Sequence, residues 1–103
     1  MKLSISVVCY DSPLIQLQSL MDSLVASIKH LRSYYELPAI PIFIIDNSSE
    51  AAATSELYRL ENTRLGEINV NLRIISGHGN IGYGRAHNLS LQLIDSDFHL
   101  ILN

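Results

Sequence analysis

The sequence is poor in several kinds of residue. It has one cysteine, no tryptophan and seven lysine and arginine residues among 103, with a formal net charge of -3 at pH 7. A single cysteine excludes an internal disulfide and fits a reducing cytosol. So few cations exclude a surface that neutralises many phosphates, so we expect no nucleic-acid partner.

Long hydrophobic runs are also missing. No apolar run reaches the roughly 18 residues of a membrane span, and the first residues have the pattern of a strand rather than of a signal peptide. We therefore expect a cytoplasmic protein, with peripheral attachment to the inner membrane face as an alternative.

The hydrophobic residues that are present, 48% of the chain, follow strand and helix patterns in turn. Apolar runs predict strands over 3–8, 42–45, 70–75 and 98–102, and spacings of three and four predict a helix over 14–35. Further helices are expected over 51–60 and 82–94, with 61–69 as a polar connector. The order βαβαβαβ predicts a single α/β domain over 1–103, with helices on both faces of a parallel, Rossmann-like sheet.

Polar residues and glycines follow the predicted strands, and these loops meet at one edge of a parallel sheet, where such folds bind ligands. Four of the five glycines lie in "SGHGNIGYG", residues 76–84. Residues 77–82 match the G-x-G-x-x-G dinucleotide pattern. The match follows the third strand instead of the first, and the next strand ends in Asn103 instead of an acid, so we do not expect a dinucleotide.

Asp46, at the end of the second strand, has three interpretations. Its carboxylate could accept a hydrogen bond from a base or ribose, it could cap the following helix, or it could accept a phosphoryl group. The last role needs several acids around a divalent cation, and only Asp11 is a candidate companion. The sequence leaves the first two open.

Cys9 ends an apolar run and is interpreted as core filling rather than as a nucleophile. The four histidines show no i,i+4 pair, so a zinc site has no support, and we expect His30 and His99 to be structural. Arg85, at the start of the third helix, could contact a diphosphate or lie solvated on the surface.

Four segments together resemble the N-terminal half of a family 2 glycosyltransferase of the GT-A fold, including its rhamnosyltransferase-like branch. "ISVVCYDSP" resembles the first strand and loop, "IFIIDNSS" the second strand with its aspartate, "NIGYGRAHN" the N-x-G-x-x-x-A-x-N element, and "FHLILN" the strand before the acidic motif. The resemblance covers essentially the whole chain. It implies a domain that binds a nucleotide-diphosphate sugar, as in hexosyltransferases that build polysaccharides or glycans.

The resemblance also implies which residues bind the nucleotide. Asp46 would accept from the pyrimidine ring or ribose, and the glycines would let the backbone approach the nucleotide. Asp11 stands where the family often has asparagine. The full set implied for the nucleotide site is Tyr10, Asp11, Asp46, Asn80, Gly82, Arg85 and Asn88.

The family's catalytic and metal-binding acids have no counterpart in the sequence, which stops at Asn103, just before their expected position. We therefore expect a truncated chain, with no catalytic residue or metal ligand of its own and no activity alone. The full-length enzyme would use Mg or Mn and a saccharide or lipid-linked acceptor. The uncovered apolar sheet edge predicts self-association. The alternative is a non-catalytic α/β nucleotide-binding or regulatory module.

Overall fold

Strands and helices alternate along the whole chain in the computed structural model, which describes residues 1–103. The elements are β1 (Leu3–Cys9), α1 (Leu14–Arg32), β2 (Ile40–Asp46), α2 (Ala52–Glu67), β3 (Val70–Ile75), α3 (Tyr83–Leu91) and β4 (Phe98–Leu102). All strand pairs are parallel, and the order in the sheet is β3-β2-β1-β4. This spatial order differs from the chain order because β4 returns to lie beside β1, an arrangement consistent with a Rossmann-like sheet.

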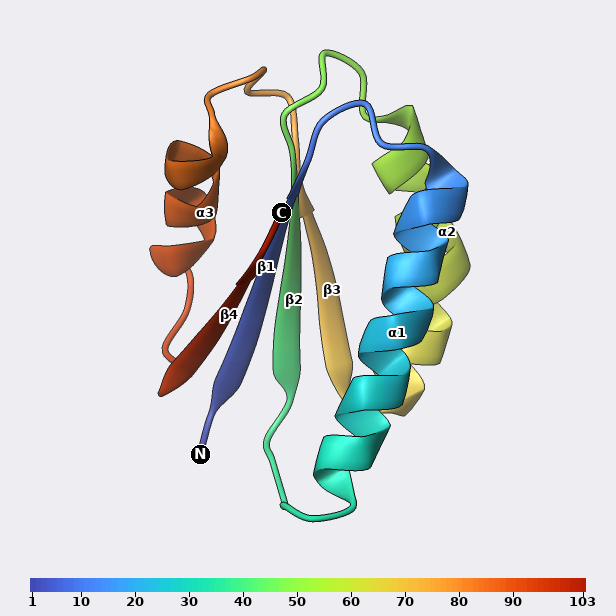
Figure 1. Cartoon of the computed structure of the whole chain (residues 1–103), viewed down its shortest axis with the longest axis vertical. Coiled ribbons are helices and arrows are strands. Elements are labelled where there is room, and N and C mark those ends of the chain that lie inside the picture. Colours follow the sequence, from blue (N-terminus) through green and yellow to red (C-terminus); the bar gives the residue numbers. More distant parts are fainter.

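The helices cover the two faces of the sheet unequally. Figure 1 shows α1 and α2 side by side on one face and the shorter α3 alone on the other. The loops that follow β1, β2 and β3 all lie at the upper edge in this view, and the C-terminus reaches the same end of the sheet. The sheet therefore forms the middle of three layers, and its carboxyl edge gathers the loops expected to carry a site.

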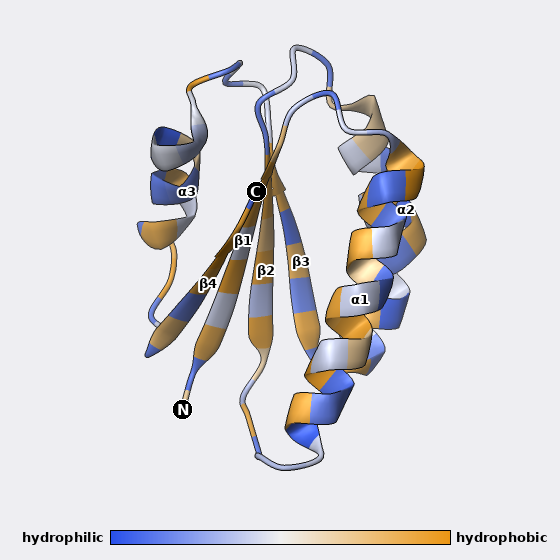
Figure 2. Cartoon of the chain, viewed as in Figure 1, coloured by the Kyte–Doolittle hydropathy of each residue, from blue (hydrophilic) through white to orange (hydrophobic).

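The face under α1 and α2, here called the apolar face, holds most of the core. Sixteen buried hydrophobic residues form one cluster there. From α1 the cluster takes a stripe at helical spacing, Leu17, Met21, Leu24, Val25 and Ile28. Alternate strand residues such as Ile5, Val7, Ile42 and Ile44 meet this stripe, and Figure 2 shows the hydrophobic colour on the strands and along the helices. Burial of this apolar surface supplies the main driving force for folding.

The face under α3, here called the polar face, is built differently. Its hydrophobic cluster has four buried residues, Val8, Phe43, Ile45 and Ala86. Beside them lie the buried side chains of Ser4, Ser6 and His87. At the open side of this face the guanidinium of Arg73 lies 5.8 Å from the centre of the Phe43 ring, a distance typical of a cation–π contact.

Three helix ends differ from the sequence prediction. The first helix ends at Arg32 instead of near residue 35, and the third ends at Leu91 instead of near residue 94. The second continues to Glu67, so most of the expected polar connector is helical. Glu61 explains the error, because it occupies a buried position between Leu57 and Leu65 and forms an ion pair of 2.7 Å with Arg64. Glu61 therefore takes a place on the buried side of α2 where an apolar residue would be expected, and the apolar spacing cannot be recognised in the sequence.

The outer strand β4 is poorly covered. Phe98, Leu100 and Ile101 are exposed by 60%, 44% and 53% of their surface. Exposed apolar edge strands favour pairing with other chains. Self-association at this edge stays a prediction.

Candidate functional site

Hydrogen bonds join the three loops at the carboxyl edge. The backbone N–H of Asn47 donates to the carbonyl of Cys9 (2.9 Å), and the N–H of Asp11 donates to Ser48 Oγ (2.6 Å). The Asn47 side-chain amide reaches the carbonyl of Gly82 (3.4 Å). The loops after β1, β2 and β3 therefore form one connected surface, at the place where the sequence predicted a site.

Asp46 lies at this edge but does not face the solvent. It is 3% exposed, and each of its carboxylate oxygens has a partner within the chain. Oδ1 accepts from the Ser48 N–H (2.9 Å) and Oδ2 from the Thr54 hydroxyl (2.8 Å), which ties the end of β2 to α2. The alternative of a helix cap is wrong, because the N-cap of α2 is Ala51, without a side-chain cap.

Cys9 is part of the apolar cluster, as the sequence predicted. Burial raises the pKa of its thiol to about 12, and the neighbouring Asp46 carboxylate adds to this shift. Because the thiolate is the reactive form, Cys9 is inert as a nucleophile at neutral pH.

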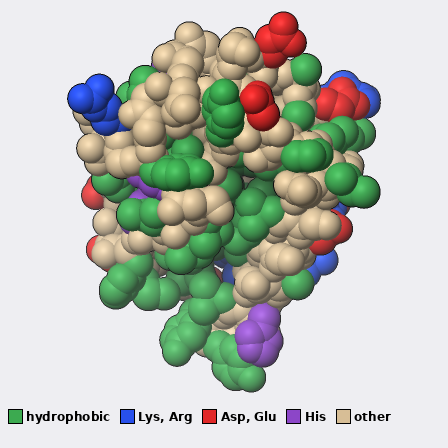
Figure 3. Space-filling model, turned by 45° about the horizontal axis from the view of Figure 1, so that its top comes forward, with side chains coloured by type: hydrophobic (Ala, Val, Ile, Leu, Met, Phe, Trp, Pro, Cys, Tyr) green, Lys and Arg blue, Asp and Glu red, His purple; other side chains and the backbone are tan.

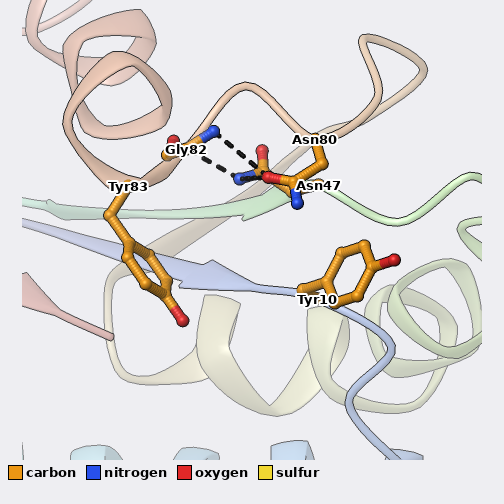
Figure 4. A pocket seen from close by; sticks show the side chains of 5 residues that line it. All are labelled: Tyr10, Asn47, Asn80, Gly82 and Tyr83. Atoms are coloured by element: carbon orange, nitrogen blue, oxygen red, sulfur yellow. Dashed lines mark hydrogen bonds between the residues drawn. The ribbon is translucent and has the colours of Figure 1, made fainter.

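A pocket of about 250 Å³ opens between these loops. Its lining consists of Tyr10, Asn47, Asn80, Gly82 and Tyr83. Figure 4 shows the rings of Tyr10 and Tyr83 on opposite sides of the opening, with the side chains of Asn47 and Asn80 above them in this view. Both rings are more than half exposed, so they offer apolar surface to a ligand. Tyr10, Asn80 and Gly82 were predicted from the sequence; Asn47 and Tyr83 were not.

Asn47 is the centre of the hydrogen bonds around the pocket. Its amide Nδ2 donates to Asn80 Oδ1 (3.5 Å) as well as to the Gly82 carbonyl. Its Oδ1 is 2.8 Å from His78 Nε2, and Asn80 Oδ1 also accepts from the Gly82 N–H (3.1 Å). With the Asn80 oxygen engaged, the Asn80 amide N–H groups are left for a ligand. The signal for Asn47 was its place directly after Asp46, in a run of polar residues that follows a buried strand.

The glycines of this loop are required by backbone conformation. Gly77, Gly79 and Gly82 have φ angles of 87°, 73° and 81°, a region that other residues rarely adopt. No atom lies within 4 Å of a Cβ placed at any of them, so packing within the chain does not require glycine there.

The remaining predicted residues lie near the pocket without lining it. Asp11 is exposed with a φ of 50°, and Arg85 and Asn88 are exposed on α3. No group of three histidine, cysteine or acidic side chains comes together in residues 1–103 as a metal site. Figure 3 shows basic side chains dispersed at the rim of the face turned forward instead of gathered in a patch.

Two other hollows border this region. One, of about 350 Å³, lies between α2 and β3 and is lined by Ser55, Tyr58, Ile74 and Ser76. The other, of about 240 Å³, lies under the first loop and has Cys9, Ser12, Gln16 and Asn103 in its lining. Neither joins residues from all three loops, and the first contains no titratable group other than a tyrosine.

Comparison of the chain with known protein families, with curated proteins and with solved structures found no match. None of the three helices combines the length and apolar character needed to cross a membrane.

Proposed function

We propose that this chain is the nucleotide-sugar-binding part of an inverting family 2 glycosyltransferase of the GT-A fold. The observation that carries the proposal is the pocket at the carboxyl edge of the parallel sheet, where Tyr10, Asn80 and Tyr83 come together from two loops and the start of α3. Open parallel α/β sheets bind ligands at this edge. The sequence resemblance supplies the class of ligand, a nucleotide-diphosphate sugar.

The pocket's chemistry suits a planar base. A heterocycle between the exposed rings of Tyr10 and Tyr83 would gain stacking, and the free Asn80 amide would donate to a ring carbonyl. Asp46 would serve the site indirectly, since its oxygens hold Ser48 and Thr54. Binding of a base or ribose by Asp46 itself, as the resemblance implies, would require one of these bonds to exchange.

The diphosphate would lie toward the start of α3. This helix begins after Gly82 with no acidic residue in its first turn, so its free N–H groups and positive dipole end are not neutralised within the chain. Arg85 is exposed in the same turn and would add a cation. Asn88, one turn further along, would contact the sugar-phosphate side.

The residues present do not make a metal site. Both carboxylate oxygens of Asp46 already accept hydrogen bonds within the chain. Asp11 belongs to no group of three histidine, cysteine or acidic side chains that could hold a metal ion. The Mg or Mn of the family would need acids from outside residues 1–103, so we derive no step through it. No carboxylate lines the pocket, and hence none is placed to deprotonate an acceptor hydroxyl.

The same observation favours a second candidate, a non-catalytic nucleotide-binding or regulatory module. A pocket without an acid can bind a nucleotide and perform no transfer. The two candidates agree on the ligand and differ in whether acids from elsewhere complete the site.

Calorimetric titration with uridine and thymidine diphosphates, with and without Mn²⁺, tests the proposal. The substitution Tyr83→Ala should weaken binding of the nucleotide by about 1–3 kcal/mol, roughly 5- to 150-fold, because one stacking surface is lost. Tyr34→Ala is the matched control, since Tyr34 is 72% exposed and follows the end of α1, outside the pocket lining. Absence of saturable binding to either nucleotide at millimolar concentration would contradict the proposal. Equal affinity for a dinucleotide would contradict the glycosyltransferase assignment.

A further inference from the structure

A continuous line of hydrogen-bonded side chains crosses the polar face and shares no residue with the pocket lining. Its members are Ser96, Ser4, His99, Ser6, His87 and Asn103, here called the polar line. The successive distances are 2.7 Å between the Ser96 and Ser4 hydroxyls, 2.6 Å from Ser4 to His99 Nδ1 and 2.7 Å from His99 Nε2 to Ser6. Ser6 is then 2.6 Å from His87 Nδ1, and His87 Nε2 is 2.9 Å from Asn103 Oδ1. The line joins β1, β4 and α3.

The donors along this line can all be satisfied in one direction. The Asn103 oxygen can only accept, so His87 carries its proton on Nε2 and accepts at Nδ1 from the Ser6 hydroxyl. Ser6 then accepts from His99 Nε2–H, which leaves His99 Nδ1 to accept from Ser4. Ser4 in turn accepts from Ser96. With both rings neutral and in this one tautomer, every donor along the line has an acceptor.

A proton added to either ring breaks this order. Protonated His99 would donate from both nitrogens, so the Ser4 and Ser96 hydroxyls would have to reverse, and the Ser96 proton would then have no acceptor on the line. Protonated His87 would donate to Ser6, which already accepts from His99, and the Ser6 hydroxyl proton would lose its acceptor. Ser4 and Ser6 are fully buried, so an unsatisfied group there is costly.

The charged groups around the line come from β3, α3 and the segment before β4. From β2 it faces the apolar side chains of Phe43 and Ile45, and Arg73 on β3 lies beyond Phe43. On α3, Arg85 is exposed. Asp95 and Asp97, in the segment before β4, pair with the side chain and backbone N–H of Lys2 (3.6 Å and 2.7 Å).

We infer that the polar line is a proton-sensitive latch, which fastens the edge strand β4 to β1 and α3 while His99 is neutral and releases β4 when His99 is protonated. The latch is a property of the fold and is independent of the nucleotide proposal. It also gives roles to His87 and His99, which the pocket does not use.

The direction of the pH effect follows from His99. Burial, and then repulsion from His87, lower the pKa of His99 below its ordinary value of 6.5. The unfolded chain therefore binds protons at a higher pH than the folded chain. The stabilisation is complete above about pH 6.5, the unfolded-state value, and is lost as the pH falls from there through the lower folded-state pKa.

Nuclear magnetic resonance of the imidazole nitrogens tests the latch in the unmodified chain. At pH 7.5 His99 should be neutral, and both rings should carry a proton on Nε2. A proton on Nδ1 of neutral His99, or a charged His99 at this pH, would overturn the inference. Below pH 6 the amides of β4 should lose more exchange protection than those of β3, the other edge strand, after correction for intrinsic rates; equal losses would also overturn it.

Urea unfolding of the chain and of His99→Gln, from pH 8 to pH 5, gives a second readout. In the parent chain the unfolding equilibrium constant should rise by up to about tenfold per pH unit for each proton taken up below pH 6.5. The slope should be shallower in His99→Gln and unchanged in His30→Gln, whose ring is exposed on α1 and stacks edge-on against Tyr34 at 5.3 Å. An unchanged slope in His99→Gln would contradict the latch.

Discussion

The two faces of the sheet use different physical means to hold a helix. On the apolar face, sixteen buried hydrophobic residues attach α1 and α2, whereas on the polar face four such residues and the polar line attach α3. Hydrophobic burial has no directional requirement and is insensitive to protons. The stability gained from hydrogen bonds between buried side chains requires that every donor and acceptor has a partner, and it changes when a side chain gains or loses a proton. The apolar face therefore supplies stability at any pH, whereas the stability contributed by the polar face depends on pH.

Shortening a core side chain should produce the largest effect and leave the contrast between the faces intact. Met21→Ala removes a side chain that is 0% exposed at the centre of the apolar face. We expect a loss of about 2–5 kcal/mol in the free energy of unfolding, from lost transfer energy and the cavity left behind. Urea denaturation measures it.

The pH dependence of stability in Met21→Ala should equal that of the parent chain, because the polar line lies on the other face. Ile15→Ala on the same helix is the control. Ile15 is 74% exposed, so its removal should change stability by no more than about 0.5 kcal/mol. A changed pH slope in Met21→Ala would show that the two faces are coupled and would break the comparison.

Removing the middle of the polar line should have a smaller effect that depends on pH. Ser6→Ala leaves His87 Nδ1 without its donor and His99 Nε2–H without its acceptor. We expect a loss of about 1–3 kcal/mol at pH 8. As the pH falls and His99 takes up a proton, the loss should become smaller, and measurements at pH 5 and pH 8 compare the two conditions.

Ser19→Ala provides the comparison for this variant, since Ser19 is exposed on α1 and a change there should stay within about 0.5 kcal/mol at both pH values. Equal destabilisation by Ser6→Ala at pH 8 and pH 5 would mean that the serine contributes packing alone.

The apolar face was predictable because its pattern is local. The α1 stripe and the alternating strands could be read directly, and the strands, helices and common edge of the loops followed from them. The sequence prediction ended the second helix too early because Glu61 has the character of a surface residue. Only the ion pair with Arg64 in the folded chain shows how the charge of Glu61 is accommodated.

The polar face and the pocket were less predictable because their contacts join distant residues. Ser6 and His87 are 81 positions apart, and Asn47 and Gly82 are 35 apart. No residue near Ser6 in the sequence indicates that its side chain bonds to a histidine. Asp46 was placed at the correct edge, yet its hydrogen bond to Thr54 depends on how the two side chains are oriented in the fold, which the sequence pattern does not give.

The smallest expected effect concerns α3, which has 9 residues against 19 in α1. Gly84 is the second residue of α3, and a Cβ placed there meets no atom within 4 Å. Gly84→Ala should therefore raise the free energy of unfolding by about 0.5–1 kcal/mol, because alanine loses less conformational entropy than glycine in a helix. Urea denaturation at pH 8 measures the gain.

Gly82→Ala, two residues earlier, should have the opposite sign. A Cβ at Gly82 also meets no atom, but its φ of 81° and ψ of 167° lie in a region essentially restricted to glycine, so alanine should lower stability by about 1–3 kcal/mol. A Cβ has room at both positions, so the backbone angles decide whether alanine stabilises or destabilises the chain. A gain at Gly84 that persists at pH 5 would show that helix propensity strengthens the polar face independently of the latch. If Gly84→Ala is instead destabilising while Gly82→Ala is neutral, the helix begins later than Tyr83, and the pocket wall formed by that residue would have to be redrawn.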